Sequence, residues 1–269
     1  MSETCGPSLP EPPRRERIAL TRKISSAMAR CELTHLQRTA IDVDLAREQH
    51  RAYEQALRDL GWRIESLPEE PELPDSVFVE DTAIVLDEVA VITRPGALSR
   101  RPETASVAAV LGKHRDLLRL ESPGTLDGGD VLRVARSLYV GTSSRSDASG
   151  IEQLGVLLRP FGYRVLPVPV QGCLHLKSAV TQVAAGELLI NPRHVERRHF
   201  PGMRFIEVDG SEPSGANALM AGADVIYPRS YPRTAEILRQ HGIRVHTVEM
   251  SETEKAEGAV TCCSLLIAG

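Results

Sequence analysis

The chain has 269 residues, of which 42% are hydrophobic and 25% charged, a composition typical of folded globular proteins rather than disordered or fibrous ones. Its 32 Lys and Arg and 36 Asp and Glu residues leave a net charge of -4, so the broad basic surface that nucleic acids require is not expected. No uncharged run approaches the ~18–20 apolar residues of a membrane span, and the Pro-, Glu- and Arg-rich start has no apolar signal region. We therefore expect a cytoplasmic protein without nucleic-acid or membrane partners, with a flexible tail over residues 1–16 and a single domain over residues 17–269.

The five cysteines favour free thiols over disulfides. Their number is odd, and Cys262 and Cys263 are adjacent, so a bond between these two would close a strained ring. Free thiols fit a reducing compartment. The cysteines therefore raise a question of reactivity rather than of cross-linking.

The N-terminal part of the chain predicts a strand, a helix and a strand, followed by a pair of strands. Asp42 and Asp44 precede apolar residues at helical spacing, and Gly61 ends that pattern. Two apolar, β-rich runs separated by Asp87 and Glu88 indicate the strand pair. Here we expect helices at 42–60 and 102–111, and strands at 17–21, 62–67, 77–86, 89–93 and 117–121.

The rest of the chain repeats this plan three times. We expect strand pairs at 131–134 with 137–141, 178–184 with 187–191, and 218–221 with 223–228. Each pair is followed by a helix, at 150–161 and 232–241, or by a short basic segment, and then by a strand at 163–167, 205–208 or 244–248. A last strand at 259–267 is expected to pair with the N-terminal unit.

Polar residues mark the starts of the units. Asp81, Asp130, Ser178 and Asn217 lie 49, 48 and 39 residues apart. Repeats of about this period are typical of radial or stacked folds, so we favour one closed α/β domain of five ββαβ units. An open α/β sheet would show similar spacing, and periodicity alone does not separate the two.

Four segments are richer in polar residues than their apolar flanks explain, at 73–81, 125–130, 174–178 and 261–264. Each has a structural explanation of its own. These explanations are a buried ion pair with an arginine for Glu80 and Asp81, a tight turn for Asp127 to Asp130, a hydrogen-bonded core histidine for His175, and small buried hydrophobes for Cys262 and Cys263.

Together the four segments supply complementary chemistry. Hydrolysis at a weakly electrophilic carbon can use a thiolate nucleophile, a histidine that moves protons, a carboxylate that orients it, and further carboxylates for a cationic substrate. All four lie at the ends of units, where a radial fold would bring them to one cavity. Other candidates are weaker, because arginines surround His194, Glu196 and His199 as in a solvated basic face, and no Gly-rich phosphate loop is present.

Five ordered motifs carry a resemblance to a known family. They are LPDSVFVED at 73–81, ITRPGALSRR at 92–101, TLDGGDVL at 125–132, HLKS at 175–178 and VTCCS at 260–264. From about Asp75 to the C-terminus the chain resembles the dimethylarginine dimethylaminohydrolases, which belong to the guanidino-group-modifying enzymes. The resemblance implies a five-bladed α/β propeller with pseudo-fivefold symmetry, and an enzyme that requires no metal or organic cofactor.

The resemblance also implies a role for each matched residue. Cys262 would be the nucleophile, His175 the general acid and base, and Asp127 the carboxylate that orients the histidine. Substrate contacts are implied for Glu80 and Asp81 on the guanidinium, Arg100 and Arg145 on the α-carboxylate, Asp75 as a further polar contact, Ser178 beside the histidine, and the backbone of Ala256 on the amino group. The chain departs from the animal enzymes at residues 28–36, where the family has a mobile lid, and at Ala256, where those enzymes have valine.

The implied reaction is hydrolysis of an Nω-methylated arginine to citrulline and methylamine or dimethylamine. The bound guanidinium would lower the pKa of Cys262 toward the thiolate, and a thiouronium would form on that residue. Two alternatives stay open. Arginine deiminase uses the same machinery on unmethylated arginine, and a non-catalytic binder of arginine-like ligands would not need the thiol. No oligomeric state is predicted.

Overall fold

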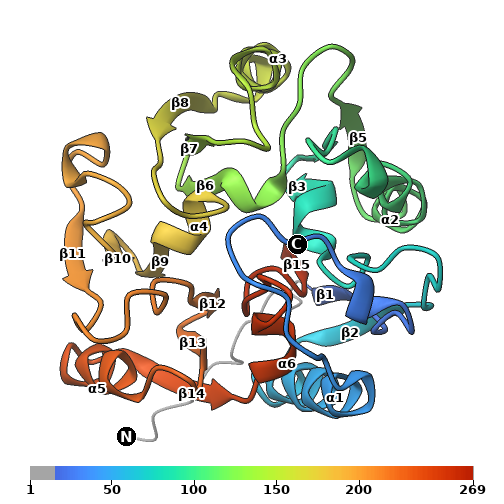
Figure 1. Ribbon diagram of the computed structural model, residues 1–269. Coiled ribbons are helices and arrows are strands. Elements are labelled where there is room, and N and C mark those ends of the chain that lie inside the picture. Colours follow the sequence, from blue (N-terminus) through green and yellow to red (C-terminus); the bar gives the residue numbers. More distant parts are fainter. Residues whose placement is uncertain (1–15, 269) are drawn as a thin grey trace, which may run out of the picture.

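The strands form five three-stranded sheets around a common centre, with the longer helices at the rim (Figure 1). This computed structural model describes residues 16–268, so the expected tail at 1–16 lies outside it apart from Glu16. The sheets are β15-β1-β2 (Leu265–Ala268, Arg17–Arg22, Arg63–Leu67), β3-β4-β5 (Ala83–Val85, Val89–Ile92, Asp116–Arg119), β6-β7-β8 (Val131–Val134, Ser137–Thr142, Arg164–Pro169), β9-β10-β11 (Val180–Ala184, Glu187–Ile190, Arg204–Glu207) and β12-β13-β14 (Leu219–Ala221, Asp224–Pro228, Arg244–Val248). The α-helices are α1 (Val43–Asp59), α2 (Glu103–Leu111), α3 (Ala148–Leu158), α4 (Leu176–Ala179), α5 (Pro232–Gln240) and α6 (Ser251–Glu254).

Each sheet combines one antiparallel and one parallel pair of strands. In the third sheet, β6 pairs antiparallel with β7, and β7 pairs parallel with β8. A parallel pair needs a crossover connection, which α1, α2, α3 and α5 supply in four units and a 3-10 helix at Arg197–His199 in the other. The C-terminal β15 closes the ring by pairing antiparallel with β1, with Leu265 opposite Leu20. The predicted five-bladed α/β propeller is thereby confirmed.

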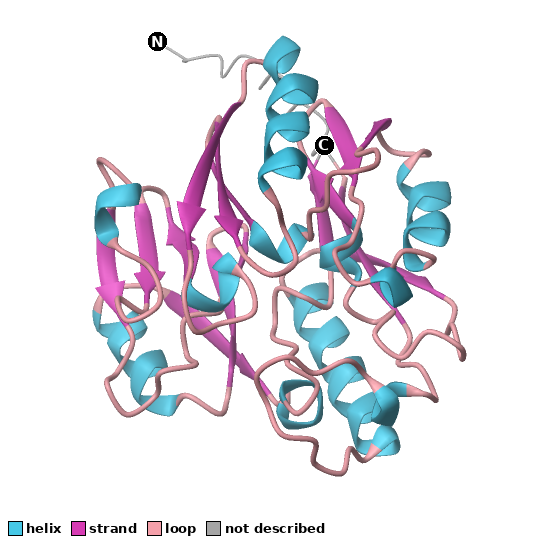
Figure 2. Cartoon of the chain, turned by 45° about the horizontal axis from the view of Figure 1, so that its top comes forward, coloured by secondary structure: helices cyan, strands magenta, loops and turns pink. Residues whose placement is uncertain are grey.

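Helix α1 connects the rim of the molecule to its centre. Asp42 caps the N-terminus of this helix, since its side chain accepts two backbone hydrogen bonds from the first turn. On the buried face of the helix, the Tyr53 hydroxyl donates to the carbonyl oxygen of Val260 at 2.9 Å and lies 2.7 Å from the Ser264 hydroxyl. These bonds hold the turn that carries Cys262. Figure 2 shows the helices alongside the strands in a turned view.

Hydrogen bonds between neighbouring units form a polar ring at the centre. Each bond joins the residues before the first strand of one unit to the matching residues of the next. They run from Gly129 N to Asp81 Oδ1 (2.9 Å), Leu176 N to Asp130 Oδ1 (2.9 Å), Asn217 Nδ2 to Lys177 O (3.1 Å), Thr261 N to Asn217 Oδ1 (3.1 Å) and Glu80 N to Cys262 O (3.1 Å). Three of the four polar residues that marked unit starts in the sequence therefore hold adjacent units together.

The predicted starts of three strands were wrong, because each strand begins later in the chain than expected. Residues 77–82 form turns and a 3-10 helix before β3, residues 259–264 form turns before β15, and residues 178–179 belong to α4. A strand directs successive side chains to opposite faces, whereas these turns present neighbouring polar residues to the centre. Apolar composition alone does not reveal such bends.

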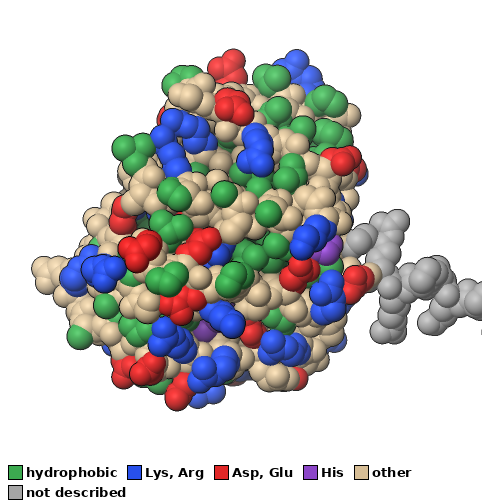
Figure 3. Space-filling model, turned by 90° about the vertical axis from the view of Figure 1, so that its right-hand side faces the viewer, with side chains coloured by type: hydrophobic (Ala, Val, Ile, Leu, Met, Phe, Trp, Pro, Cys, Tyr) green, Lys and Arg blue, Asp and Glu red, His purple; other side chains and the backbone are tan. Residues whose placement is uncertain are grey.

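One face of the molecule has a mixed surface. On the face that Figure 3 shows, basic, acidic and apolar side chains are interspersed rather than gathered by kind. Within residues 16–268, no helix has the combination of length and apolar composition needed to cross a bilayer.

Candidate active site

Eight of the ten predicted site residues line one small cavity where the starts of the units meet. They are Asp75, Asp81, Arg100, Asp127, Arg145, His175, Ala256 and Cys262. The cavity encloses about 20 Å³, which is room for about one water molecule. A ligand of amino-acid size therefore requires some of the lining residues to move.

Cys262 lies on the turn before β15, where the backbone N–H of Ala259 donates to its Sγ at 3.4 Å. Burial raises the pKa of this thiol well above its ordinary value, and the negative charges of Glu80 and Asp81 raise it further. The group is thus a neutral thiol in the ligand-free protein. Because carboxylates cause part of the shift, a cation bound between them and the sulfur would favour the thiolate.

His175 lies between two carboxylates. Its Nε2 is 3.2 Å from Asp127 Oδ2, and its Nδ1 is 3.9 Å from Asp81 Oδ1. Asp127 is itself fixed, because its Oδ1 accepts a hydrogen bond from Gly96 N at 2.9 Å. Burial alone would lower the pKa of His175, but the charge of Asp81 and the bond to Asp127 raise it to about 9. At neutral pH the histidine is therefore an imidazolium that can donate a proton.

Asp81 also pairs with a buried arginine. Arg100 Nη1 lies 2.5 Å from Asp81 Oδ2, and Arg100 Nη2 lies 2.8 Å from Glu103 Oε2 and 3.0 Å from the carbonyl oxygen of Phe78. Burial would raise the pKa of Asp81, but His175 and Arg100 lower it to about 2. Asp81 is therefore ionised. Most N–H groups of Arg100 donate hydrogen bonds to other groups of the protein.

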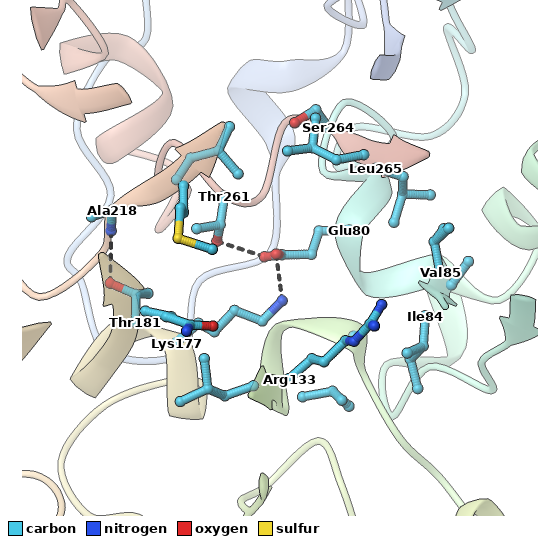
Figure 4. A pocket seen from close by; sticks show the side chains of 18 residues that line it. Glu80, Ile84, Val85, Arg133, Lys177, Thr181, Ala218, Thr261, Ser264 and Leu265 are labelled. Atoms are coloured by element: carbon cyan, nitrogen blue, oxygen red, sulfur yellow. Dashed lines mark hydrogen bonds and ion pairs between the residues drawn. The ribbon is translucent and has the colours of Figure 1, made fainter. Parts of the chain in front are cut away.

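The Glu80 side chain does not line this cavity but faces a second one of about 210 Å³. Its Oε1 accepts from Lys177 Nζ at 2.5 Å and its Oε2 from Thr261 Oγ1 at 2.7 Å (Figure 4). Figure 4 shows the carboxylate held between these two partners. Glu80 thus affects Cys262 through its negative charge. Its carboxylate oxygens accept hydrogen bonds from Lys177 and Thr261 on the side of the second cavity.

The loop between β1 and α1 passes over the centre of the molecule (Figure 1). Its Glu32 N–H donates to Asp75 Oδ2 at 3.1 Å. The carboxylate of Glu257 accepts from three consecutive backbone N–H groups of the loop, those of residues 34–36, at 2.9, 2.5 and 2.6 Å. Glu257 has a φ of 58°, which is rare for a residue other than glycine. The loop is therefore anchored on both sides of the cavity.

The remaining predicted residues differ in position. Arg145 reaches the cavity with a largely buried guanidinium, and the buried Ala256 has a carbonyl oxygen to which no donor within residues 16–268 forms a hydrogen bond. Ser178 does not reach this cavity and lines a neighbouring one of about 220 Å³ together with Cys173. Its backbone N–H donates to the carbonyl oxygen of His175 at 3.0 Å, so it contacts the histidine as the sequence suggested.

One group of side chains has the geometry of a metal site. Ligand atoms of Asp81, Asp127 and His175 lie within 4.8 Å of one another. The same carboxylates already accept hydrogen bonds from Gly129 and Gly96. Catalysis without a metal stays a prediction.

Gly129→Ala is expected to lower turnover far more than stability. A Cβ at this position would lie 2.6 Å from His175 Nδ1 and 2.7 Å from Asp81 Oδ1, so one of these side chains must shift. Displacement of reacting groups by a fraction of an ångström to 1 Å can cost ~10²-fold in rate. The matched control is Gly155→Ala in α3, where the nearest atom is 3.7 Å away. Steady-state kinetics and thermal melts of both variants check this, and an unimpaired Gly129→Ala enzyme would show that the histidine needs no fixed position.

Alkylation of Cys262 by iodoacetamide is expected to accelerate with pH beyond pH 9, because the pKa of the buried thiol is raised. Asp81→Asn removes one cause of that shift, so at any given pH the thiolate fraction and the alkylation rate should rise. Asp87→Asn, which removes an exposed carboxylate paired with Arg133, is the charge-matched control. Mass spectrometry of the Cys262 peptide gives the rates, and equal rates in all three proteins would contradict the assigned cause.

The sequence reasoning missed three residues that shape this site. Lys177 lies within the HLKS motif and forms the ion pair with Glu80, a contact across 97 residues. Glu32 and Glu257 stand in or beside segments that were noted only as departures from the family pattern. Neither of these two glutamates lies in a matched motif, so the sequence carried no signal for their positions.

Comparison with known proteins agrees with this geometry. The family model described as "N,N dimethylarginine dimethylhydrolase, eukaryotic" matches residues 25–198. The N(G),N(G)-dimethylarginine dimethylaminohydrolase of Streptomyces coelicolor is 42% identical over 92% of this chain and 95% of its own length. That of Pseudomonas aeruginosa is 37% identical over 83% of this chain and 89% of its own.

Solved structures resemble the chain over nearly its whole length. A cysteine-to-serine mutant of the Pseudomonas aeruginosa enzyme, complexed with citrulline, superposes with a TM-score of 0.90 at 33% identity, covering 94% of this chain and 99% of that one. A histidine-to-glycine dimethylarginine dimethylaminohydrolase, as an adduct with S-methyl-L-thiocitrulline, gives 0.89 at the same identity and coverage. With the family model, the sequence relatives and the fold in agreement, the chain belongs to the dimethylarginine dimethylaminohydrolase family.

Proposed function

We propose that this protein hydrolyses Nω-methylated arginines, namely asymmetric dimethylarginine and monomethylarginine, to citrulline and dimethylamine or methylamine. The observation that carries the proposal is the meeting of Cys262, His175, Asp127 and Asp81 in one closed cavity. A thiol, a protonated histidine and carboxylates are the groups that substitution at a guanidinium carbon needs. The ligands of the related solved structures, citrulline and a thiocitrulline adduct, are of matching chemistry.

The guanidinium of the substrate binds beside Asp81. Glu80, which faces the neighbouring cavity, adds a second negative charge close to it. The positive charge of the guanidinium offsets the two carboxylates that raise the pKa of Cys262, so the thiol loses its proton when substrate is bound. Arg145 binds the α-carboxylate, while Asp75 and the carbonyl oxygen of Ala256 face the amino group. Arg100 acts chiefly by holding Asp81.

The thiolate of Cys262 attacks the central guanidinium carbon and forms a neutral tetrahedral adduct. His175 then donates its proton to the methylated nitrogen, the carbon–nitrogen bond breaks, and dimethylamine leaves from a cationic thiouronium. The neutral histidine next removes a proton from water, whose oxygen attacks the same carbon. The carbon–sulfur bond then breaks and the hydroxyl proton of the adduct passes to the departing sulfur, which completes citrulline, restores the Cys262 thiol and leaves His175 protonated for the next cycle.

The free thiols and the small substrate support a cytoplasmic location. All four described cysteines are unpaired, as a reducing compartment would keep them. No macromolecular partner is required by the reaction.

The test is a comparison of kcat/KM for asymmetric dimethylarginine, monomethylarginine and arginine, measured as citrulline formation with identification of the released amine. We expect the methylated substrates to be preferred. Ammonia release from arginine at the higher kcat/KM would make the protein an arginine deiminase. Binding of all three compounds without citrulline formation would make it a non-catalytic binder.

A further inference from the structure

The side-chain carboxylate of Glu32 forms an ion pair with Arg145, the arginine proposed to bind the substrate α-carboxylate. Glu32, on the loop between β1 and α1, lines the cavity and places its Oε2 3.4 Å from Arg145 Nη1. The second carboxylate oxygen, Oε1, accepts a hydrogen bond from the Ser99 hydroxyl. Arg145 also donates to the Thr34 hydroxyl at 3.0 Å, so both of its contacts with the loop lie within three residues.

Arg145 is the better placed of the two lining arginines for binding an incoming carboxylate. Arg100 is buried and already carries two carboxylates, those of Asp81 and Glu103, together with backbone carbonyl oxygens. Within residues 16–268, Arg145 has a single carboxylate partner, Glu32, and the side chain of that partner is 41% exposed. A long ion pair of 3.4 Å with a partly exposed carboxylate is weak, so a ligand carboxylate can compete for the arginine.

The backbone of the loop is held independently of this ion pair. The N–H of Glu32 is bound by Asp75, and the N–H groups of residues 34–36 are bound by Glu257. The Glu32 side chain can therefore leave Arg145 and turn toward solvent while these anchors remain. Its departure also frees space in a cavity that holds about one water molecule.

We propose that Glu32 is an internal competitor for the α-carboxylate site: ligands with an α-carboxylate displace it from Arg145, and it returns as the product leaves. The inference rests on the proposed use of Arg145 by the substrate. It makes Glu32 a residue that sets affinity selectively for carboxylate-bearing ligands. A ligand without that group leaves the pair intact and gains nothing from Arg145.

The test measures binding of citrulline and of its decarboxylated analogue, N-carbamoylputrescine, by calorimetry. Glu32→Gln should bind citrulline about two- to fivefold more tightly than the wild type, the range expected from one weak ion pair with a partly exposed carboxylate, and should bind the analogue unchanged. Glu196→Gln, which removes an exposed carboxylate paired with Arg198, is the charge-matched control and should change neither affinity. In an Arg145→Ala background the effect of Glu32→Gln should vanish.

Weaker or unchanged citrulline binding by Glu32→Gln, or an equal change for both ligands, would overturn the inference. Persistence of the effect without Arg145 would also overturn it. Failure of the proposed function has a different signature, because wild-type protein would then bind citrulline but release none from methylated arginines. Turnover measured on the same preparations separates the two results.

Discussion

Cys262→Ser should abolish citrulline formation, by about 10⁴-fold or more, whereas Cys263→Ser should retain most of it. Cys262 lines the cavity beside His175, and a serine hydroxyl there would be too weakly acidic to supply the nucleophile. Cys263 is fully buried, and its thiol donates to the carbonyl oxygen of Ala259 at 3.7 Å. The two thiols are adjacent in the chain, but Cys262 would act as the nucleophile whereas Cys263 packs in the core.

Steady-state citrulline assays on the two variants give the comparison, with thermal melts as the control for folding. Both variants should melt cooperatively, and Cys262→Ser should still bind citrulline. Activity retained in Cys262→Ser, or lost only in a well-folded Cys263→Ser, would reverse the assignment.

His175→Ala should lower kcat by about 10²–10⁴-fold and leave the affinity for citrulline nearly unchanged. The wild-type pH profile gives a second readout. Below pH 9, kcat/KM should rise with pH because the thiol of Cys262 has a raised pKa and must lose its proton. Above pH 9 the rise should end, because the pKa of His175 is raised to about 9 and loss of its proton then offsets further ionisation of the thiol.

In His175→Ala the break near pH 9 should disappear while the rising limb persists. Kinetics from pH 6 to 10.5 on both proteins check this. A variant with near wild-type rate, or one that keeps the break, would show that the histidine is structural, as a hydrogen-bonded core histidine would be.

The fold was predictable where local chemistry decides it. The Asp42 cap and the spacing that follows it determine α1, and the short β-rich pairs determine most strands. Residues 77–82 and 259–264 were not predictable, because their bends depend on contacts between them. Gly258 packs directly against the ring of Phe78, and Glu80 N donates to the Cys262 carbonyl oxygen. The apolar composition of a segment does not indicate which residues nearly two hundred positions away will contact it.

The site shows the same division. The motifs identified the residues that now meet around Cys262, yet they could not show how the charges pair. Asp81 lines the cavity and also forms the buried ion pair with an arginine, Arg100, that its apolar flanks suggested, while its contact with a substrate stays a prediction. Glu80 meets Lys177 only because the units close into a ring. Arg145 meets Glu32 only because the loop between β1 and α1 passes over the cavity.

The most direct test of the proposed chemistry is mass spectrometry of acid-quenched enzyme during turnover of asymmetric dimethylarginine, with peptide mapping of any adduct. We expect a thiouronium adduct on the peptide that contains Cys262, present while substrate is being turned over and absent once the substrate is consumed. Accumulation of citrulline while Cys262 stays unmodified at every quench time, or an adduct on another cysteine, would contradict covalent catalysis by this residue.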